Sequence, residues 1–137
     1  MSTIPVNTSY QAALDASLTD PEAFWGKAAE ALEWFTPPSR GYDDASGWFA
    51  GGMLNTCHNC VDRHVAAGRG YAPALIYDSP VTGTIHTYSY ADLLDETGRV
   101  AAMLAHLGVG KGDRVVLYMP MIPQTVFAML ACARLGA

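Results

Sequence analysis

The fold class is decided by residues 90–137, YADLLDETGRVAAMLAHLGVGKGDRVVLYMPMIPQTVFAMLACARLGA. Apolar residues recur at helical spacing over residues 90–107, and an almost wholly apolar run at residues 115–118 predicts a strand covered on both faces. Residues 123–135 carry apolar side chains on several sides, which predicts a second helix buried by neighbouring elements. The order helix, strand, helix is typical of a layered α/β sheet.

A β-hairpin is predicted ahead of this stretch. Residues 74–77 and 85–88 are expected to form its two strands, and residues 78–83 its turn. Gly108 is expected to end the helix over residues 90–107, because glycine readily adopts the left-handed backbone found at helix C-termini. The predicted fold is therefore α/β, with a hairpin followed by an α–β–α unit.

The N-terminal half is predicted to be mainly helical. Residues 10–18 indicate a short helix, whose candidate caps are Asn7, Thr8 and Ser9. Asp20 followed by Pro21 predicts the start of a second helix that runs through residue 32 and buries one face.

The next stretch is expected to be an ordered loop and then a third helix. Residues 40–52, rich in glycine, serine and aromatic residues, indicate a loop with short extended pieces. Residues 54–67 indicate the helix, which Gly68 and Gly70 are expected to end. Four aromatic side chains are expected to form a core under the loops rather than a ligand platform: Trp25, Trp34, Trp48 and Phe49.

The composition narrows the class of protein. Of the 137 residues, 15% are charged, against about 25% in typical soluble domains, which favours a piece that packs against more protein. The formal net charge of −5 does not suit nucleic acid or anionic membrane surfaces. Residues 115–133 carry no charge, but Pro120 and Pro123 divide them into pieces too short to span a membrane.

Cysteine usage and the N-terminus indicate the compartment. Three cysteines, an odd number, provide no disulfide framework and favour a reducing environment. The first ten residues show neither a secretory signal nor a transit peptide. The expected location is the cytoplasm.

One glycine-rich stretch superficially resembles a phosphate-binding loop. Residues 108–113 read GVGKGD. Phosphate loops follow a strand and open a helix, whose N-terminal amides face the anion. Here the predicted order is helix, glycines, strand. A helix cap and a turn are therefore favoured over nucleotide contact.

Cys57, Cys60 and His64 are the candidate metal ligands. At positions i, i+3 and i+7 of a helix they are expected to share one face, with a fourth ligand from His58, His86 or Cys132. Structural zinc sites usually add a second Cys or His pair, which this sequence lacks. Cys57 also falls on an apolar stripe, with Leu54, Val61 and Val65, so no metal site is predicted.

Catalytic chemistry is not predicted either. A nucleophilic Cys57 or Cys60 beside His58 or His64 is disfavoured, because these residues are sequence neighbours rather than groups that converge across a cleft. Asp62, Arg63 and His64 are interpreted as a local ion pair that orients a helix end. No catalytic, cofactor-binding or metal residue is assigned.

Six stretches, taken in order, resemble the N-terminal region of the short-chain, AMP-forming acyl-CoA synthetases, the acetyl- and propionyl-CoA synthetase group of the adenylate-forming enzymes. The resemblance covers the chain from about residue 21 onward. The stretches are PEAFWG at residues 21–26, WFAGG at 48–52 followed by Asn55, NCVDRH at 59–64, GDRVV at 112–116, YMPMIP at 118–123 and LACARLGA at 130–137.

The resemblance implies an N-terminal cap segment over residues 1–67 and the start of the AMP-binding large domain over residues 68–137. It implies a ligase that uses ATP, Mg²⁺ and CoA to convert propionate or acetate to acyl-CoA, AMP and diphosphate through an acyl-adenylate. The family's phosphate loop, acyl pocket, adenylation lysine and CoA-binding residues all lie beyond residue 137. The segment alone is thus expected to be inactive, with the remainder of the adenylation domain as its partner.

The substrate is expected to be a short-chain carboxylate. NTCHN at residues 55–59 and IYDSPVT at residues 76–82 resemble the propionyl branch of the family. Two other hypotheses stay open: a free-standing binding or assembly module that reuses this N-terminal half, and a small zinc module on Cys57, Cys60 and His64. The genomic sequence past Ala137 discriminates between the ligase and the free-standing module.

Overall fold

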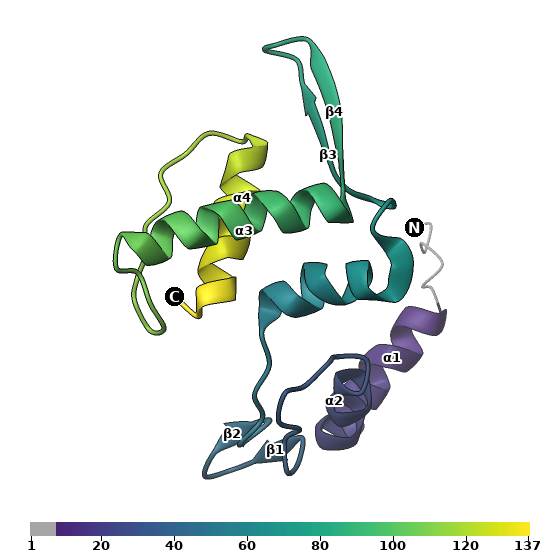
Figure 1. Cartoon of the computed structure of the whole chain (residues 1–137). Helices are drawn as coiled ribbons and strands as arrows, with labels where there is room; N and C mark the ends of the chain where they lie inside the picture. Colours follow the sequence, from purple (N-terminus) through teal and green to yellow (C-terminus); the bar gives the residue numbers. More distant parts are fainter. Residues whose placement is uncertain (1–7) are drawn as a thin grey trace. The chain divides into compact units, whose positions relative to one another are not determined.

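The computed structural model describes residues 8–137 (Figure 1). The chain divides into two compact units, Met1–Leu54 and Asn55–Ala137. Each unit has its own secondary structure and is described by itself.

The first unit opens with two helices, α1 (Thr8–Thr19) and α2 (Pro21–Ala29). α2 starts as predicted: Pro21 is the first helical residue, and the Asp20 carboxylate accepts a hydrogen bond from the Ala23 N–H at 3.0 Å. The helix over residues 10–18 is confirmed. α1 already includes Thr8 and Ser9, and Asn7 lies outside the described residues.

α2 differs from the prediction in length and burial. It ends at Ala29, and tighter turns follow, in which the Leu32 N–H bonds the Ala29 carbonyl at 3.1 Å. The predicted buried face is wrong, because Ala29 is the one buried residue of α2 and Trp25 is 46% exposed. An amphipathic pattern buries a face only where other elements cover it.

Residues 40–52 contain the predicted short extended pieces. β1 (Tyr42–Asp43) pairs antiparallel with β2 (Gly47–Trp48). The Phe49 N–H donates to the Gly41 carbonyl at 2.9 Å and closes this small hairpin.

The aromatic core predicted for this unit is only partly formed. Phe49 has both Trp34 and Trp48 as neighbours at ring-centroid distances of 5.8 Å. Trp48 is 47% exposed, and Trp25 pairs with Phe24 instead, at 5.1 Å. These side chains form a half-exposed layer, because the unit has too little chain to cover them.

The second unit begins with a helical segment over residues 56–69. Most of it has the wide turns of a π-helix, η1 (His58–Asp62) and η2 (Val65–Arg69). The predicted helix is confirmed in kind, but it starts two residues later and is wider than an α-helix. Gly68 has the left-handed φ of 77° near its end, and Gly70 caps it, as predicted.

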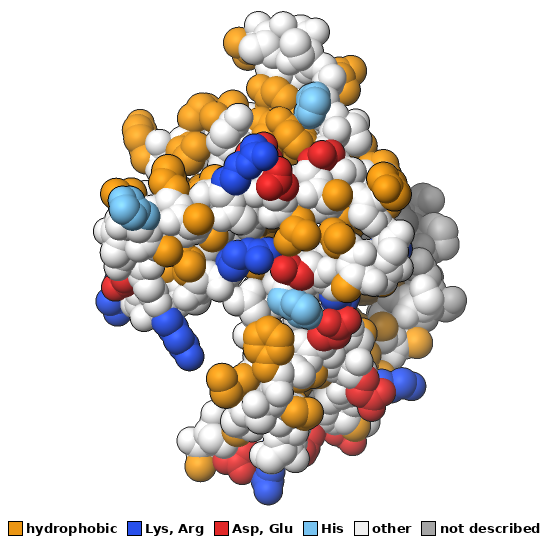
Figure 2. Space-filling view, in the orientation of Figure 1, with side chains coloured by type: hydrophobic (Ala, Val, Ile, Leu, Met, Phe, Trp, Pro, Cys, Tyr) orange, Lys and Arg blue, Asp and Glu red, His pale blue; other side chains and the backbone are white. Residues whose placement is uncertain are grey.

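The predicted β-hairpin is confirmed and is longer than expected. β3 (Pro73–Ser79) pairs antiparallel with β4 (Thr84–Ser89), with Tyr77 opposite His86. Figure 1 shows this hairpin projecting from the helices of its unit. Figure 2 shows hydrophobic side chains on the visible surface of the hairpin. Ile76 in β3 and Ile85 in β4 are 65% and 71% exposed.

α3 (Tyr90–His106) follows the hairpin and ends one residue before the predicted bound. A capping box starts it: the Ser89 hydroxyl accepts from the Asp92 N–H at 3.2 Å, and the Asp92 carboxylate accepts from the Ser89 N–H at 2.9 Å. Gly108, with φ of 91°, supplies the left-handed residue expected after the helix.

The predicted strand at residues 115–118 is wrong. Residues 113–120 have no regular secondary structure. Val115 and Leu117 are half-buried, whereas Val116 is 90% exposed and Tyr118 fully exposed. The alternation typical of a strand is present, but a strand also needs a hydrogen-bonded neighbour. In the part of the chain that the structure describes, β3 and β4 pair only with each other.

α4 (Pro123–Leu135) has the predicted bounds and contributes to the core of the second unit. That core contains Cys57, Val61, Leu93 and Phe127, where α3 packs against α4 and η1. Other elements cover α4 on one side only, since Met129 is 60% exposed.

The stretch without charges at residues 115–133 consists of a segment without regular secondary structure and part of α4. The longest described helix, α3, has 17 residues and carries charged side chains. Within residues 8–137 no helix combines the length and the apolar character needed to cross a membrane.

Candidate functional site

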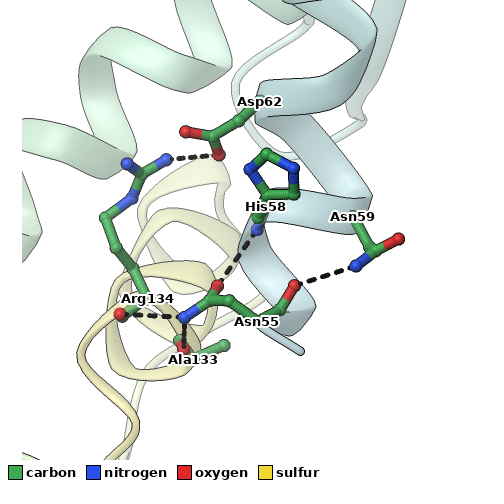
Figure 3. Close-up of polar contacts among 6 residues, drawn as sticks. All are labelled: Asn55, His58, Asn59, Asp62, Ala133 and Arg134. Atoms are coloured by element: carbon green, nitrogen blue, oxygen red, sulfur yellow. Dashed lines mark hydrogen bonds and ion pairs between the residues drawn. The ribbon is translucent and has the colours of Figure 1, made fainter. Parts of the chain in front are cut away.

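A polar cluster joins the start of the residue 56–69 helical segment to the end of α4 (Figure 3). Its centre is Asn55. The Asn55 Nδ2 donates to the backbone carbonyls of Ala133 at 3.1 Å and Arg134 at 3.0 Å. The Asn55 Oδ1 accepts from the His58 N–H at 3.0 Å. One side chain thus contacts two helix ends that lie 78 and 79 residues apart in sequence.

Local sequence explains why both helix ends are open to such contacts. The first amides and last carbonyls of a helix lack partners within it, and asparagine is a favoured N-cap residue. Gly136 follows α4, and its φ of 77° turns the chain so that the Ala137 N–H bonds the Cys132 carbonyl at 3.0 Å. The Arg134 carbonyl is left for Asn55.

An ion pair extends the cluster. The Arg134 guanidinium donates to the Asp62 carboxylate at 2.7 Å, and the two side chains are 29% and 27% exposed. The local pair predicted from Asp62, Arg63 and His64 misses this partner, which is 72 residues away. Arg63 donates to the Asn59 Oδ1 at 3.3 Å, and Asn59 donates to the Asn55 carbonyl at 3.2 Å.

The cysteines do not form the arrangement expected for a metal. Cys57 is fully buried and Cys60 is exposed, so the expectation that they share one face is wrong. The wide turns of η1 change the angle between residues three apart relative to an α-helix. Among the described residues, no group of three or more His, Cys, Asp or Glu side chains could hold a metal ion.

Cys57 has the surroundings of a structural thiol. It lies in the core on the predicted apolar stripe, next to Val61. Burial raises the pKa of the Cys57 thiol, and the neighbouring Arg134 guanidinium acts in the opposite direction. A thiol whose pKa is raised is a weak nucleophile, because the thiolate is the reactive form. His64 packs its ring against Tyr90 at a centroid distance of 4.7 Å and contacts the Arg69 guanidinium.

The glycine-rich stretch at residues 108–113 forms the predicted helix cap and turn. The Gly110 N–H donates to the Asp113 carboxylate at 2.7 Å, and the Asp113 N–H donates to the Gly110 carbonyl at 3.2 Å. The Gly112 N–H donates to the Gly136 carbonyl at 2.8 Å. These three amides thus donate to groups of the chain itself.

Comparison with known protein families identifies the family of this chain, which the geometry of the polar cluster does not. The model of the AMP-binding enzymes matches residues 62–137. The chain belongs to the AMP-binding enzyme family. The model of the acetyl-coenzyme A synthetase N-terminus matches residues 10–60 of this AMP-binding family member, directly ahead of the first match. The resemblance inferred from the six sequence stretches is confirmed.

Individual relatives are similar over nearly all of the chain. Acyl-CoA synthetase short-chain family member 3, mitochondrial, of Rattus norvegicus is 51% identical over 132 residues, which are 93% of this chain and 19% of that protein. The acetyl-coenzyme A synthetase of Gemmatimonas aurantiaca is 48% identical over 126 residues, 90% of this chain and 19% of that protein.

A solved structure is also similar. The acetoacetyl-CoA synthetase from Streptomyces lividans has a TM-score of 0.80 and 32% sequence identity, over 96% of this chain and 21% of that chain. This AMP-binding family member thus spans about a fifth of the length of the relatives it matches.

Sequence reasoning found the residues of the polar cluster but not their arrangement. Asn55, residues 59–64 and residues 130–137 belong to separate stretches that carry the family resemblance. The structure brings them together at the C-terminus of α4 (Figure 3). The available signal was the polar character of Asn55 and Asp62, which stand between members of the apolar stripe in the sequence.

Proposed function

We propose that this chain is part of an AMP-forming acid–thiol ligase that joins propionate to CoA at the expense of ATP, releasing AMP and diphosphate. The observation that carries the proposal is the adjacency of the two family matches, at residues 10–60 and 62–137. Together they favour the ligase over the free-standing module, because they follow the order expected for a short-chain acyl-CoA synthetase.

The division of labour within the chain is also proposed. Residues 1–67 act as a cap segment, and residues 68–137 begin the AMP-binding domain. ATP, Mg²⁺, CoA and the carboxylate are held by other parts of the ligase, since the amides of Gly110, Gly112 and Asp113 donate to groups within the chain. No catalytic step is therefore assigned to the described residues, whose role is to support the scaffold. The remainder of the adenylation domain is the proposed partner, and the cytoplasm the proposed location.

The activity is tested on the product of the whole reading frame that contains this sequence. We expect propionate-dependent exchange of pyrophosphate into ATP, which reports reversible formation of an acyl-adenylate, and CoA-dependent release of AMP. The 137-residue chain, purified in parallel, is expected to give exchange at the level of a mock preparation. A full-length product without exchange on any short-chain acid contradicts the ligase proposal.

Substrate preference is tested separately by kcat/KM for acetate, propionate and butyrate on one preparation. Apolar pockets discriminate by about 1–3 kcal/mol for each methylene, so propionate is expected to exceed acetate by about tenfold to a few hundredfold. The support is the resemblance of residues 55–59 and 76–82 to the propionyl branch. Acetate equal to or better than propionate rejects the propionate assignment and leaves the ligase proposal intact.

A further inference from the structure

We propose that Asn55 is a two-sided clamp, a positioning residue whose single amide group holds the C-terminus of α4 against the N-terminus of the residue 56–69 helical segment. Its Oδ1 caps one helix through the His58 N–H, and its Nδ2 caps the other through the carbonyls of Ala133 and Arg134. The Asn55 carbonyl also accepts from the Asn59 N–H at 3.1 Å, as the carbonyl of an N-cap residue does.

The chemistry of this position requires a primary amide of asparagine length. Asparagine carries both an acceptor oxygen and a two-proton donor on one short side chain. Serine, aspartate and asparagine are about equal as N-caps, but aspartate has no donor when ionised and serine has a single hydroxyl proton. Only the amide can serve both helix ends in this geometry.

Electrostatics also favour the pairing of these two ends. A helix N-terminus carries partial positive charge and a C-terminus partial negative charge. The amide group of Asn55 is itself a dipole, with its oxygen toward the His58 N–H and its nitrogen toward the two carbonyls (Figure 3). The two helix ends and the amide are therefore aligned so that each attracts the next.

Arg134 of α4 is held by two separate contacts. Asn55 binds the Arg134 carbonyl, while Asp62 binds the Arg134 guanidinium at 2.7 Å. The Gly112 N–H binds the Gly136 carbonyl directly beyond α4. Three segments distant in sequence thus meet at the end of α4, and loss of the clamp should loosen this junction before it affects the β3–β4 hairpin.

The clamp goes beyond the proposed ligase activity and does not depend on it. It accounts for two stretches to which no chemistry could be assigned, residues 55–64 and 130–137, as the two halves of one junction. Its test uses the 137-residue chain itself, so that failure of the clamp and failure of the ligase proposal are separate results.

Three variants distinguish a clamp from an ordinary N-cap: Asn55→Ala, Asn55→Asp and Asn55→Ser. If Asn55 were only an N-cap, the aspartate and serine variants would match the wild type in stability, because both retain the acceptor oxygen. The clamp predicts that both are destabilised, the aspartate variant at least as much as the alanine variant, because its carboxylate faces two carbonyl oxygens. Asp20→Asn at the cap of α2 is the matched control and should change little.

The measurement is the unfolding equilibrium in urea together with amide hydrogen exchange. We expect the unfolding constant of the alanine and aspartate variants to rise about tenfold or more, and that of the serine variant to lie nearer alanine than wild type. Exchange at Gly136, Ala137 and Gly112 should accelerate before exchange in the hairpin. Failure of the aspartate and serine variants to fold, with the Asp20→Asn control folded, also supports the clamp.

Two results overturn the proposal. The first is an aspartate variant within about twofold of the wild type in its unfolding constant. The second is equal acceleration of exchange at Gly136 and at the hairpin amides of Tyr77 and His86 in every variant, which would assign Asn55 a global packing role.

Discussion

The two units of the chain are stabilised by different means. Met1–Leu54 contains seven of the 13 acidic and two of the eight basic residues, and so carries the whole formal net charge of −5. Among its described residues only Ala29 is a buried hydrophobic. Asn55–Ala137 has no net formal charge and encloses a core around Cys57, Val61, Leu93 and Phe127.

This contrast shows that apolar residues in a helix do not by themselves determine whether the helix buries a face. α2 and α4 both start with proline and both carry apolar residues. α4 buries Phe127, Ala128 and Ala131 because α3 lies against it, whereas α2 relies on its Asp20 cap and on partly exposed ring contacts. Most helix stability in proteins comes from such tertiary packing rather than from propensity.

The largest expected difference between the units comes from removing one aromatic ring from each. Phe127→Ala should destabilise the second unit by about 3–5 kcal/mol, because Phe127 is 3% exposed and its ring packs edge-on to Tyr88 at 5.3 Å. Trp25→Ala should cost about 1 kcal/mol or less, since Trp25 is 46% exposed. Urea unfolding followed by far-UV circular dichroism measures both, and equal losses would contradict the contrast.

An intermediate effect is expected from the helix caps. Ser89→Ala breaks the capping box of α3, and Asp20→Ala removes the cap of α2. Each should cost about 1 kcal/mol locally. We expect Ser89→Ala to lower the unfolding midpoint of the second unit and Asp20→Ala to leave that midpoint unchanged, while hydrogen exchange in α2 accelerates.

A shift of the second unit's midpoint by Asp20→Ala would show that the two units unfold as one. The control for the α3 cap is Ser46→Ala, which removes a serine hydroxyl in the first unit, at the β1–β2 turn, and should not affect α3.

Features set by neighbours in sequence could be predicted, because the forces that form them act locally. α4 has the expected bounds, residues 123–135, and Gly108 follows α3 as expected. The hairpin followed from two apolar runs around a turn at Gly83, whose φ is 66°. The glycine stretch at residues 108–113 formed the predicted cap and turn for the same reason.

Features set by distant segments could not be predicted. Val115 and Leu117 have the alternation of a strand, but whether a strand forms depends on a neighbour that the local pattern does not reveal. The partners of Asn55 and Asp62 are set by the packing of α4, more than 70 residues away. The wide turns of η1, which separate Cys57 from Cys60, have no signal in local spacing.

The smallest expected effect is on the acid titration of one aspartate in each unit, Asp92 and Asp43. The hydroxyl and then the backbone N–H of Ser89 hold the pKa of Asp92 below its ordinary value. The hydroxyl of Ser46, and then the N–H groups of Ala45 and Ser46, do the same for Asp43. Because the pKa of each aspartate is lower in the folded state, its ionised form contributes to folding stability. This contribution is fully present above the unfolded pKa of about 3.9 and is lost as the pH falls through the folded pKa.

The two carboxylates should respond independently to loss of their serine partners. Ser89→Ala is expected to raise the pKa of Asp92 toward the unfolded value and leave Asp43 unchanged, and Ser46→Ala should do the reverse. Carboxyl-carbon NMR titration between about pH 2 and 6 measures both groups in one sample, and the range follows from the aspartate value of about 3.9. Movement of both pKa values in either variant would mean that the charge environments of the two units are coupled. Independent changes in the two pKa values would show that the two units are separate in their electrostatics as well as in their packing, because each carboxylate is held by its own turn.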